Sequence, residues 1–332
     1  MTARQDITAG NGVSEGLGPS AAPIPGDTTA NSAAYRPTEL FTPETDPQSQ
    51  IIGPSLAKVM DLSAARVSRV MAEFDPTYIV LTVSGGRDSA AEVAFALELG
   101  LKVDLILHCR TGTGIRQTTE HVVDYYGTLG PEFVMADAGD AYERYVIRKG
   151  FFGIGRDAHN FSYRVLKAQP MRTALSHTLR KGRRGVRIML LNGARALESD
   201  NRRLNLQETR KDPAAPNNLW VNLLHDWSDA DRDNYLRLRG VPINPVAKEL
   251  CRSGECLCGT MQTAQDRIQA SALYPEWGNW IDDLERRAIA LHGWGWGVTM
   301  PKPVDPNQIE LFTPLCMGCA RDAAARGEAI AA

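Results

Sequence analysis

The chain has 332 residues, of which 43% are hydrophobic, and its formal net charge at pH 7 is −2. This length and composition allow a sizeable core, and the near-neutral charge excludes a general electrostatic attraction to nucleic acid. No apolar run approaches the length of a membrane span, and the N-terminus lacks the pattern of a signal peptide, so we expect a cytoplasmic protein with no membrane partner.

The first part of the chain predicts a disordered tail followed by a helix. Residues 1–55 are rich in Ala, Gly, Pro, Ser and Thr and show no apolar period that would favour an ordered structure. From Pro54 to Phe74, apolar residues recur near helical spacing, and Asp75-Pro76 then indicates a turn. We expect this helix to cover the sheet that follows.

A short glycine-containing loop separates a predicted strand from a predicted helix. The apolar run Tyr78 to Val83 indicates a buried strand, and a helical pattern runs from Ala90 to Leu99, with Asp88 or Ser89 available as its N-cap. The loop between them consists of Ser84, Gly85, Gly86, Arg87, Asp88 and Ser89. Adjacent glycines let a backbone approach a ligand, and the free N–H groups of a helix N-terminus bind anions. The loop therefore predicts a phosphate site, and the alternative is a strand-to-helix turn without a ligand.

Strands and helices continue to alternate along the chain. Further strands are predicted at 103–108, 132–136 and 186–191, and further helices at 117–129, 140–149 and 171–181. Such alternation predicts an α/β fold, with a parallel sheet covered by helices on both faces. In sheets of this kind the ligand site lies beyond the carboxyl ends of the strands.

Two segments that follow predicted strands carry candidate binding residues. The first contains Thr111 and Gly112, preceded by His108 and Cys109, which we expect only to fill the strand end. The second consists of Gly193, Ala194 and Arg195, with Glu198, Ser199, Arg202 and Arg203 behind it. Arginines beyond a strand end are suited to forked contacts with phosphate or sulfate oxygens. We favour such a function for Arg195, while the basic pair after it remains open between a binding role and a solvated face.

The loop Ser84 to Ser89 resembles the PP-loop, SGGxDS, of ATP pyrophosphatases and of the 3′-phosphoadenylylsulfate (PAPS) reductase family. Thr111-Gly112 is similar to the TG segment of this family, and Gly193 to Arg195 is similar to its G-x-R segment. The stretch Asp226 to Pro245 is similar to its DW-[ST]-x-x-D…NP segment. The resemblance covers Tyr78 to Cys258 and implies an adenine nucleotide α-hydrolase-like, Rossmann-like fold. It also implies that the loop wraps the terminal phosphates of ATP, or the 3′-phosphate region of PAPS.

Five cysteines lie in the last third of the chain: Cys251, Cys256, Cys258, Cys316 and Cys319. The C-x-C and C-x-x-C pairs offer four thiolates, Cys256, Cys258, Cys316 and Cys319, for one zinc ion or iron–sulfur cluster, and spacing alone does not separate the two. The resemblance to adenylylsulfate (APS) reductases and to the sulfurtransferases of DNA phosphorothioation favours a 4Fe–4S cluster, with zinc as the alternative. Cys251 is then left as a reactive thiol or an additional ligand.

We expect four regions along the chain. After the tail at 1–55 come a nucleotide-binding domain at 56–245, a helical cysteine-rich region at 246–320 and a flexible tail at 321–332. Helices are predicted at 260–273 and 275–291, and four tryptophans are expected to pack around the metal site: Trp277, Trp280, Trp294 and Trp296.

Together these features predict an enzyme of sulfur chemistry. We expect ATP-dependent sulfur transfer, in which Mg²⁺ and the loop stabilise the leaving pyrophosphate and a sulfur donor or thiol reductant takes part. Asp88, Arg195 and Cys251 are the predicted catalytic residues, and the nucleotide-binding residues are the loop with Thr111, Gly112, Gly193 and Arg195. Reduction of PAPS or APS by a cysteine thiolate is the alternative. The resemblance implies that such reductases carry this cysteine in an ECGxH-like motif near the C-terminus. No such motif follows Cys319, which counts against the reductase.

A third hypothesis is a nucleotide- or nucleic-acid-binding module without turnover. Its basis is a cluster of basic residues suited to contact with a nucleic-acid backbone and equally typical of a charged surface loop: Arg180, Lys181, Arg183, Arg184 and Arg187.

Overall fold

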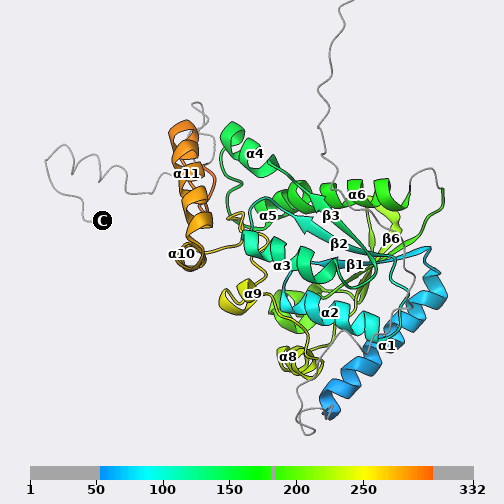
Figure 1. The fold of residues 1–332 in the computed structure, drawn as a ribbon. Helices are drawn as coiled ribbons and strands as arrows, with labels where there is room; N and C mark the ends of the chain where they lie inside the picture. Colours follow the sequence, from blue (N-terminus) through cyan, green and yellow to red (C-terminus); the bar gives the residue numbers. More distant parts are fainter. Residues whose placement is uncertain (1–52, 181–183, 302–332) are drawn as a thin grey trace, which may run out of the picture. The chain divides into compact units, whose positions relative to one another are not determined.

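The computed structural model describes residues 53–180 and 184–301 (Figure 1). The predicted tails at 1–55 and 321–332 lie outside the described residues, apart from 53–55, and so do Cys316 and Cys319. No helix in the described part of the chain is long and apolar enough to cross a membrane.

A six-stranded sheet forms the centre of the fold (Figure 1). Its strands are β1 (Tyr78–Val83), β2 (Leu105–Arg110), β3 (Glu132–Asp137), β4 (Ile188–Asn192), β5 (Thr209–Asp212) and β6 (Ala215–Asn222). Their order is β3-β2-β1-β4-β6-β5, and all neighbours are parallel except β5 and β6. The predicted α/β fold with a parallel sheet is confirmed. The antiparallel hairpin of β5 and β6 was not predicted, because Pro216, Asn217 and Asn218 interrupt any apolar run in β6.

The predicted helices are present, with ends shifted by a few residues. The helices of the first half are α1 (Pro54–Phe74), α2 (Arg87–Glu98), α3 (Arg116–Tyr126), α4 (Ala141–Lys149), α5 (Arg156–Tyr163), the π-helical turn η3 (Arg164–Ala168) and α6 (Gln169–Leu179). The second half contains the 3₁₀ turn η4 (Ala196–Glu198), α7 (Asp200–Asn205), α8 (Asp229–Leu238), α9 (Pro245–Glu249), α10 (Ala264–Leu273) and α11 (Pro275–His292). The short elements α5, η3, η4, α7 and α9 were not predicted, since they are too brief to show a helical period.

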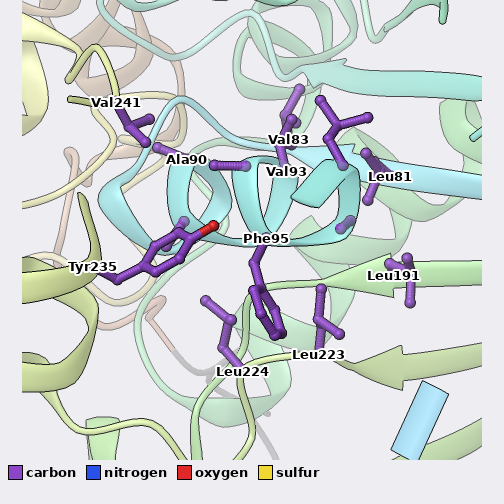
Figure 2. Close-up of a cluster of buried hydrophobic side chains, with 14 of the residues drawn as sticks. Leu81, Val83, Ala90, Val93, Phe95, Leu191, Leu223, Leu224, Tyr235 and Val241 are labelled. Atoms are coloured by element: carbon purple, nitrogen blue, oxygen red, sulfur yellow. The ribbon is translucent and has the colours of Figure 1, made fainter. Parts of the chain in front are cut away.

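The two faces of the sheet are buried by different helices. Alternate residues of β1 point to opposite faces, so Leu81 packs toward α1, α2, α3 and α8 while Val80 packs toward α6. Figure 2 shows Phe95 of α2 and Tyr235 of α8 in the first of these clusters, with ring centroids 5.8 Å apart. This packing holds α2, and therefore the loop before it, rigidly against the sheet.

A third cluster of buried side chains belongs to the C-terminal helices. Residues of α10, α11 and the segment 246–258 pack against α4 and the segment that follows it. Within it, Trp296 and Trp277 lie with ring centroids 6.5 Å apart, and the indole N–H of Trp296 donates to the carbonyl of Leu257 at 3.0 Å. Tryptophans therefore pack around the Cys256–Cys258 segment. The division of the chain after residue 245 stays a prediction.

Candidate functional site

A cavity of about 840 Å³ lies at the carboxyl ends of β1 and β4. The position fits the rule for open α/β sheets, because β1 and β4 are the neighbours at which the strand order changes direction. The cavity brings together three separate predicted segments. Its lining includes Ser84, Gly86, Arg87, Asp88, Ser89, Gly193, Arg195 and Cys251.

The loop after β1 leaves the N-terminus of α2 open to a ligand. Gly85 has a φ of +73°, a conformation that favours glycine, and Gly86 is the N-cap of α2 without a side-chain hydrogen bond. The prediction that Asp88 or Ser89 caps this helix is wrong. The Ser89 hydroxyl donates to the Gly86 carbonyl at 2.9 Å, and the Asp88 carboxylate faces arginines instead. The uncapped N–H groups and the dipole of α2 therefore suit an anion.

Asp88 is held by two arginines at the edge of the cavity. Its Oδ1 accepts from Arg195 Nε at 2.7 Å and from Arg232 Nη1 at 3.0 Å. Arg195 is only 1% exposed, and it also donates to the Trp227 carbonyl at 3.3 Å and to Asp229 at 2.8 Å. Much of the guanidinium predicted to bind phosphate is therefore used to join the loops after β1 and β4 to α8.

Gly193 permits the close approach of these loops. A Cβ atom at this position would lie 2.5 Å from the Asp88 carbonyl oxygen, which is a backbone atom and cannot move aside as a flexible side chain would. The glycine of the G-x-R segment is thus required by packing.

We expect Asp88→Asn and Ser84→Ala each to weaken nucleotide binding about tenfold. The first change removes a charged acceptor that orients the start of α2, and the second removes a hydroxyl that lines the cavity, each a loss of about 1.4 kcal/mol. Calorimetric titration with ATP and with PAPS measures the affinity, and thermal unfolding checks the fold. Unchanged affinity for both nucleotides in both folded variants would contradict a nucleotide site at this loop.

Cys251 differs from the C-x-C pair in its surroundings. It lies beyond the C-terminal end of α9, is exposed, lines the cavity and has a φ of +54°. Positive φ values in residues other than glycine are uncommon and often occur at functional sites. The segment after it lies on the loop, since a Cβ at Gly86 would be 3.4 Å from the Cβ of Ser253. Cys251 is therefore a thiol within the predicted nucleotide cavity.

Cys256 and Cys258 do not line this cavity, and their sulfur atoms lie 3.7 Å apart. Two thiolates bound to one tetrahedral zinc ion at about 2.3 Å would be roughly 3.8 Å apart, so the pair fits a shared metal centre. The hydrogen bond that Cys256 donates lowers the pKa of Cys258, and the same bond together with burial raises the pKa of Cys256. A thiolate at neutral pH is the form that binds metals.

Glu255 directly precedes Cys256 and connects the cysteine segment, residues 251–258, to the end of β2. Its Oε1 accepts from the Thr111 backbone N–H at 2.8 Å, and its carbonyl accepts from the Thr111 hydroxyl at 2.6 Å. His108 Nε2 lies 3.1 Å from the other carboxylate oxygen. Thr111 and Gly112, predicted to bind nucleotide, are absent from the lining of the cavity, and Thr111 fastens the cysteine segment. A lone glutamate carries no spacing signal, so sequence reasoning missed this contact.

Lys167 is a second residue that sequence reasoning missed. It belongs to the π-helical turn η3 and lines the cavity. Burial disfavours its charge, but Cys256, Glu255 and Cys109 nearby raise the pKa of Lys167 above its ordinary value. The lysine is thus a cation between the cavity and the cysteine segment. Insertions of π-helix are frequent at functional sites, but a single π-turn has no signature in the sequence.

Several other candidate groups are paired with neighbouring side chains. Within the described part of the chain, one cluster has three possible metal ligands, Glu208, His225 and Asp226, and its carboxylates accept from Arg66. In the predicted nucleic-acid patch, Arg187 pairs with Asp75 and Arg180 donates to Asn218, while Lys181 and Arg183 lie outside the described residues. Expected Mg²⁺ binding remains a prediction.

The fold and the site together define the class of protein. A mostly parallel sheet, with an SGGRDS loop and an open helix N-terminus at its switch point, is a nucleotide-binding α/β fold of the PP-loop type. The sequence profile of the phosphoadenosine phosphosulfate reductase domain matches residues 78–261. The chain therefore belongs to the phosphoadenosine phosphosulfate reductase domain family, whose members include enzymes.

Solved structures with a similar fold are distant in sequence. Phosphoadenylyl-sulfate reductase from Candida auris is 14% identical, with 60% of this chain and 92% of that chain covered and a TM-score of 0.41. For FMN adenylyltransferase from Candida glabrata the identity is 11%, the coverage 60% and 65%, and the TM-score 0.44. For NH₃-dependent NAD synthetase from Campylobacter jejuni the identity is 13%, the coverage 74% and 98%, and the TM-score 0.40. Among curated proteins, none matches the chain.

Proposed function

We propose that the protein is an ATP-dependent sulfurtransferase in which Cys251 carries the sulfur. The observation that carries the proposal is that an exposed cysteine and the PP-loop line one cavity. The cavity lining contains six Lys or Arg and four Asp or Glu residues, whereas the whole chain has a net charge of −2. This local excess of positive charge favours an anionic ligand such as a nucleotide.

In the first step, an oxygen of the acceptor attacks the α-phosphorus of ATP, and the bond to the β-phosphate breaks. The N–H groups at the start of α2 and the cations of the cavity stabilise the charge that develops on the leaving pyrophosphate. Mg²⁺, when bound with the nucleotide, would supply further positive charge to the leaving pyrophosphate. The product is an adenylated acceptor.

In the second step, a persulfide on Cys251 attacks the activated atom and AMP leaves. A donor that is itself a persulfide passes its outer, zero-valent sulfur to the Cys251 thiolate and leaves as a thiol. After the attack, two equivalents of a thiol reductant cleave the S–S bond between Cys251 and the acceptor and leave as their disulfide, which releases the thiolated acceptor and returns Cys251 to the thiol. The exposure of Cys251 allows a donor to reach it. The same thiol could instead attack the sulfonyl sulfur of PAPS or APS, which is the alternative function.

We also propose that Cys256 and Cys258, with Cys316 and Cys319, hold a 4Fe–4S cluster. The 3.7 Å separation of the first two sulfur atoms suits two ligands of one metal centre. When bound, such a cluster supplies a redox-active centre. Zinc is the alternative occupant of these thiolates.

The direct test is an assay of anaerobically prepared protein for two products, pyrophosphate and sulfite. Release of pyrophosphate from ATP in the presence of a sulfur donor supports sulfur transfer, and release of sulfite from PAPS or APS supports the reductase. Neither product, together with nucleotide binding, would indicate a binding module. Salt-dependent binding of DNA or RNA would then identify a nucleic-acid partner.

The anaerobic protein is expected to be brown, with absorption near 400 nm from thiolate-bound iron–sulfur centres. Iron and acid-labile sulfide should be present at about four atoms each per chain. Metal analysis together with the absorption spectrum provides the measurement. Colourless protein containing one zinc ion per chain would show that the thiolates hold zinc.

A further inference from the structure

We propose that Asp233 is a displaceable counter-ion that keeps Arg87 and Arg232 ready for the terminal phosphate of the bound nucleotide. Arg232 Nε donates to Asp233 Oδ1 at 2.8 Å, and Arg87 Nη1 lies 3.7 Å from the other oxygen, Oδ2. Two guanidinium groups from different elements, α2 and α8, thus converge on one carboxylate. This arrangement is the one that a phosphate group would require.

The three side chains differ in their freedom to move. Arg232 is largely buried, and its Nη1 is fixed by Asp88 at 3.0 Å and by Asp229 at 2.8 Å. Asp233 is 47% exposed in its side chain, and the nitrogen–oxygen distance to Arg87 is long for an ion pair. The carboxylate can therefore turn into solvent while Arg232 stays in place.

The exchange of carboxylate for phosphate is favourable on physical grounds. Release of Asp233 leaves no charge unpaired, because its half-exposed carboxylate can be hydrated and Arg232 keeps Asp88 and Asp229 as partners. A terminal phosphate carries more charge than a carboxylate and can accept from both guanidinium groups in forked geometry. Both arginines and Asp233 line the cavity that contains the PP-loop, so the phosphate would remain within reach of the loop.

The inference rests on the proposed nucleotide site and adds to it a preference for ligands that carry a phosphoryl group beyond the position of the α-phosphate. ATP and pyrophosphate have such a terminal group beyond the α-phosphate, whereas AMP does not. The pair of arginines should therefore distinguish the first two ligands from the third.

The experiment is calorimetric titration of the full-length protein with inorganic pyrophosphate, ATP and AMP at fixed ionic strength. Asp233→Asn should tighten binding of pyrophosphate and ATP about threefold to tenfold, because the competing charge is gone, and should leave AMP nearly unchanged. Asp61→Asn, an exposed change of the same charge on α1, is the matched control and should alter none of the three.

A second pair of variants separates direct competition from a general change in charge. When Asp233→Asn is added to Arg87→Gln or to Arg232→Gln, the affinity for pyrophosphate and ATP should rise by a smaller factor than in the wild-type background. The reason is that one of the two arginines freed by the loss of the carboxylate is then absent. An undiminished gain in both backgrounds, an equal gain for AMP, or no gain for pyrophosphate would overturn the inference. Failure of the wild-type protein to bind ATP would instead overturn the proposed function.

Discussion

Cys251→Ser is expected to abolish turnover while leaving the metal content and nucleotide affinity unchanged. The cysteine lines the cavity, is exposed and makes no contribution to the buried clusters, so serine can replace it without loss of packing. Serine cannot carry a persulfide, and its hydroxyl is a far weaker nucleophile than a thiolate. Loss of a covalent nucleophile typically lowers the rate by several orders of magnitude, so we expect a decrease of at least about 10³-fold.

The matched control is Cys256→Ser, at a half-buried cysteine whose sulfur lies 3.7 Å from that of Cys258. We expect this variant to lose the metal and local order in the segment 242–259. Steady-state turnover, metal analysis and nucleotide titration of both variants are the measurements. Metal loss in Cys251→Ser with a fully loaded Cys256→Ser would show that Cys251 is a ligand and that one of the C-x-C thiols is reactive.

Replacement of Arg195 is expected to have the largest effect on stability. Its guanidinium is 1% exposed and donates to Asp88, Asp229 and the Trp227 carbonyl. Arg195→Met would remove three hydrogen bonds of a buried cation and leave the Trp227 carbonyl without this donor, while Arg232 still donates to Asp88 and Asp229. Loss of charge-assisted hydrogen bonds of this kind costs about 1.5–3 kcal/mol. The loop after β4 would also lose its link to the start of α2, so nucleotide affinity should fall at least about tenfold.

Arg203→Met is the control for this change, because Arg203 is exposed and forms only a local pair with Asp200 on α7. Such a pair contributes at most about 1 kcal/mol. Urea denaturation measures the free energy of unfolding, and ATP titration measures the affinity. Equal losses of stability in the two variants would show that Arg195 does not join the three segments. Arg195→Lys should fall between them, since an ammonium keeps the charge but not the fork.

Elements with local sequence signals were predicted correctly. The apolar spacing of Pro54 to Phe74 predicted α1 with its observed bounds, and the run Tyr78 to Val83 predicted β1. The capping box at the start of α8 is likewise formed by two residues three positions apart, Ser228 and Asp231. These signals lie within a few residues of the structure that they specify, so the chain on either side of them is not needed.

The sequence also determined which segments carry the candidate site, but not how their side chains pair. Motif spacing identified the loop, the G-x-R segment and the cysteines. It led to the wrong role for Asp88 as a helix cap, because the two arginines that hold this carboxylate are 107 and 144 residues away along the chain. An acceptor that meets a charged donor in the folded state is no longer free to cap its own helix.

Only the tertiary structure decided the contacts between distant segments. Thr111 meets Glu255 across 144 residues, Lys167 reaches the cavity from a π-helical turn, and β6 joins β4 despite a polar sequence. Each of these contacts depends on the parallel sheet, which brings the carboxyl ends of separate strands to one edge. Local conformational propensity does not predict these tertiary contacts, because the partner that stabilises each residue lies far away along the chain.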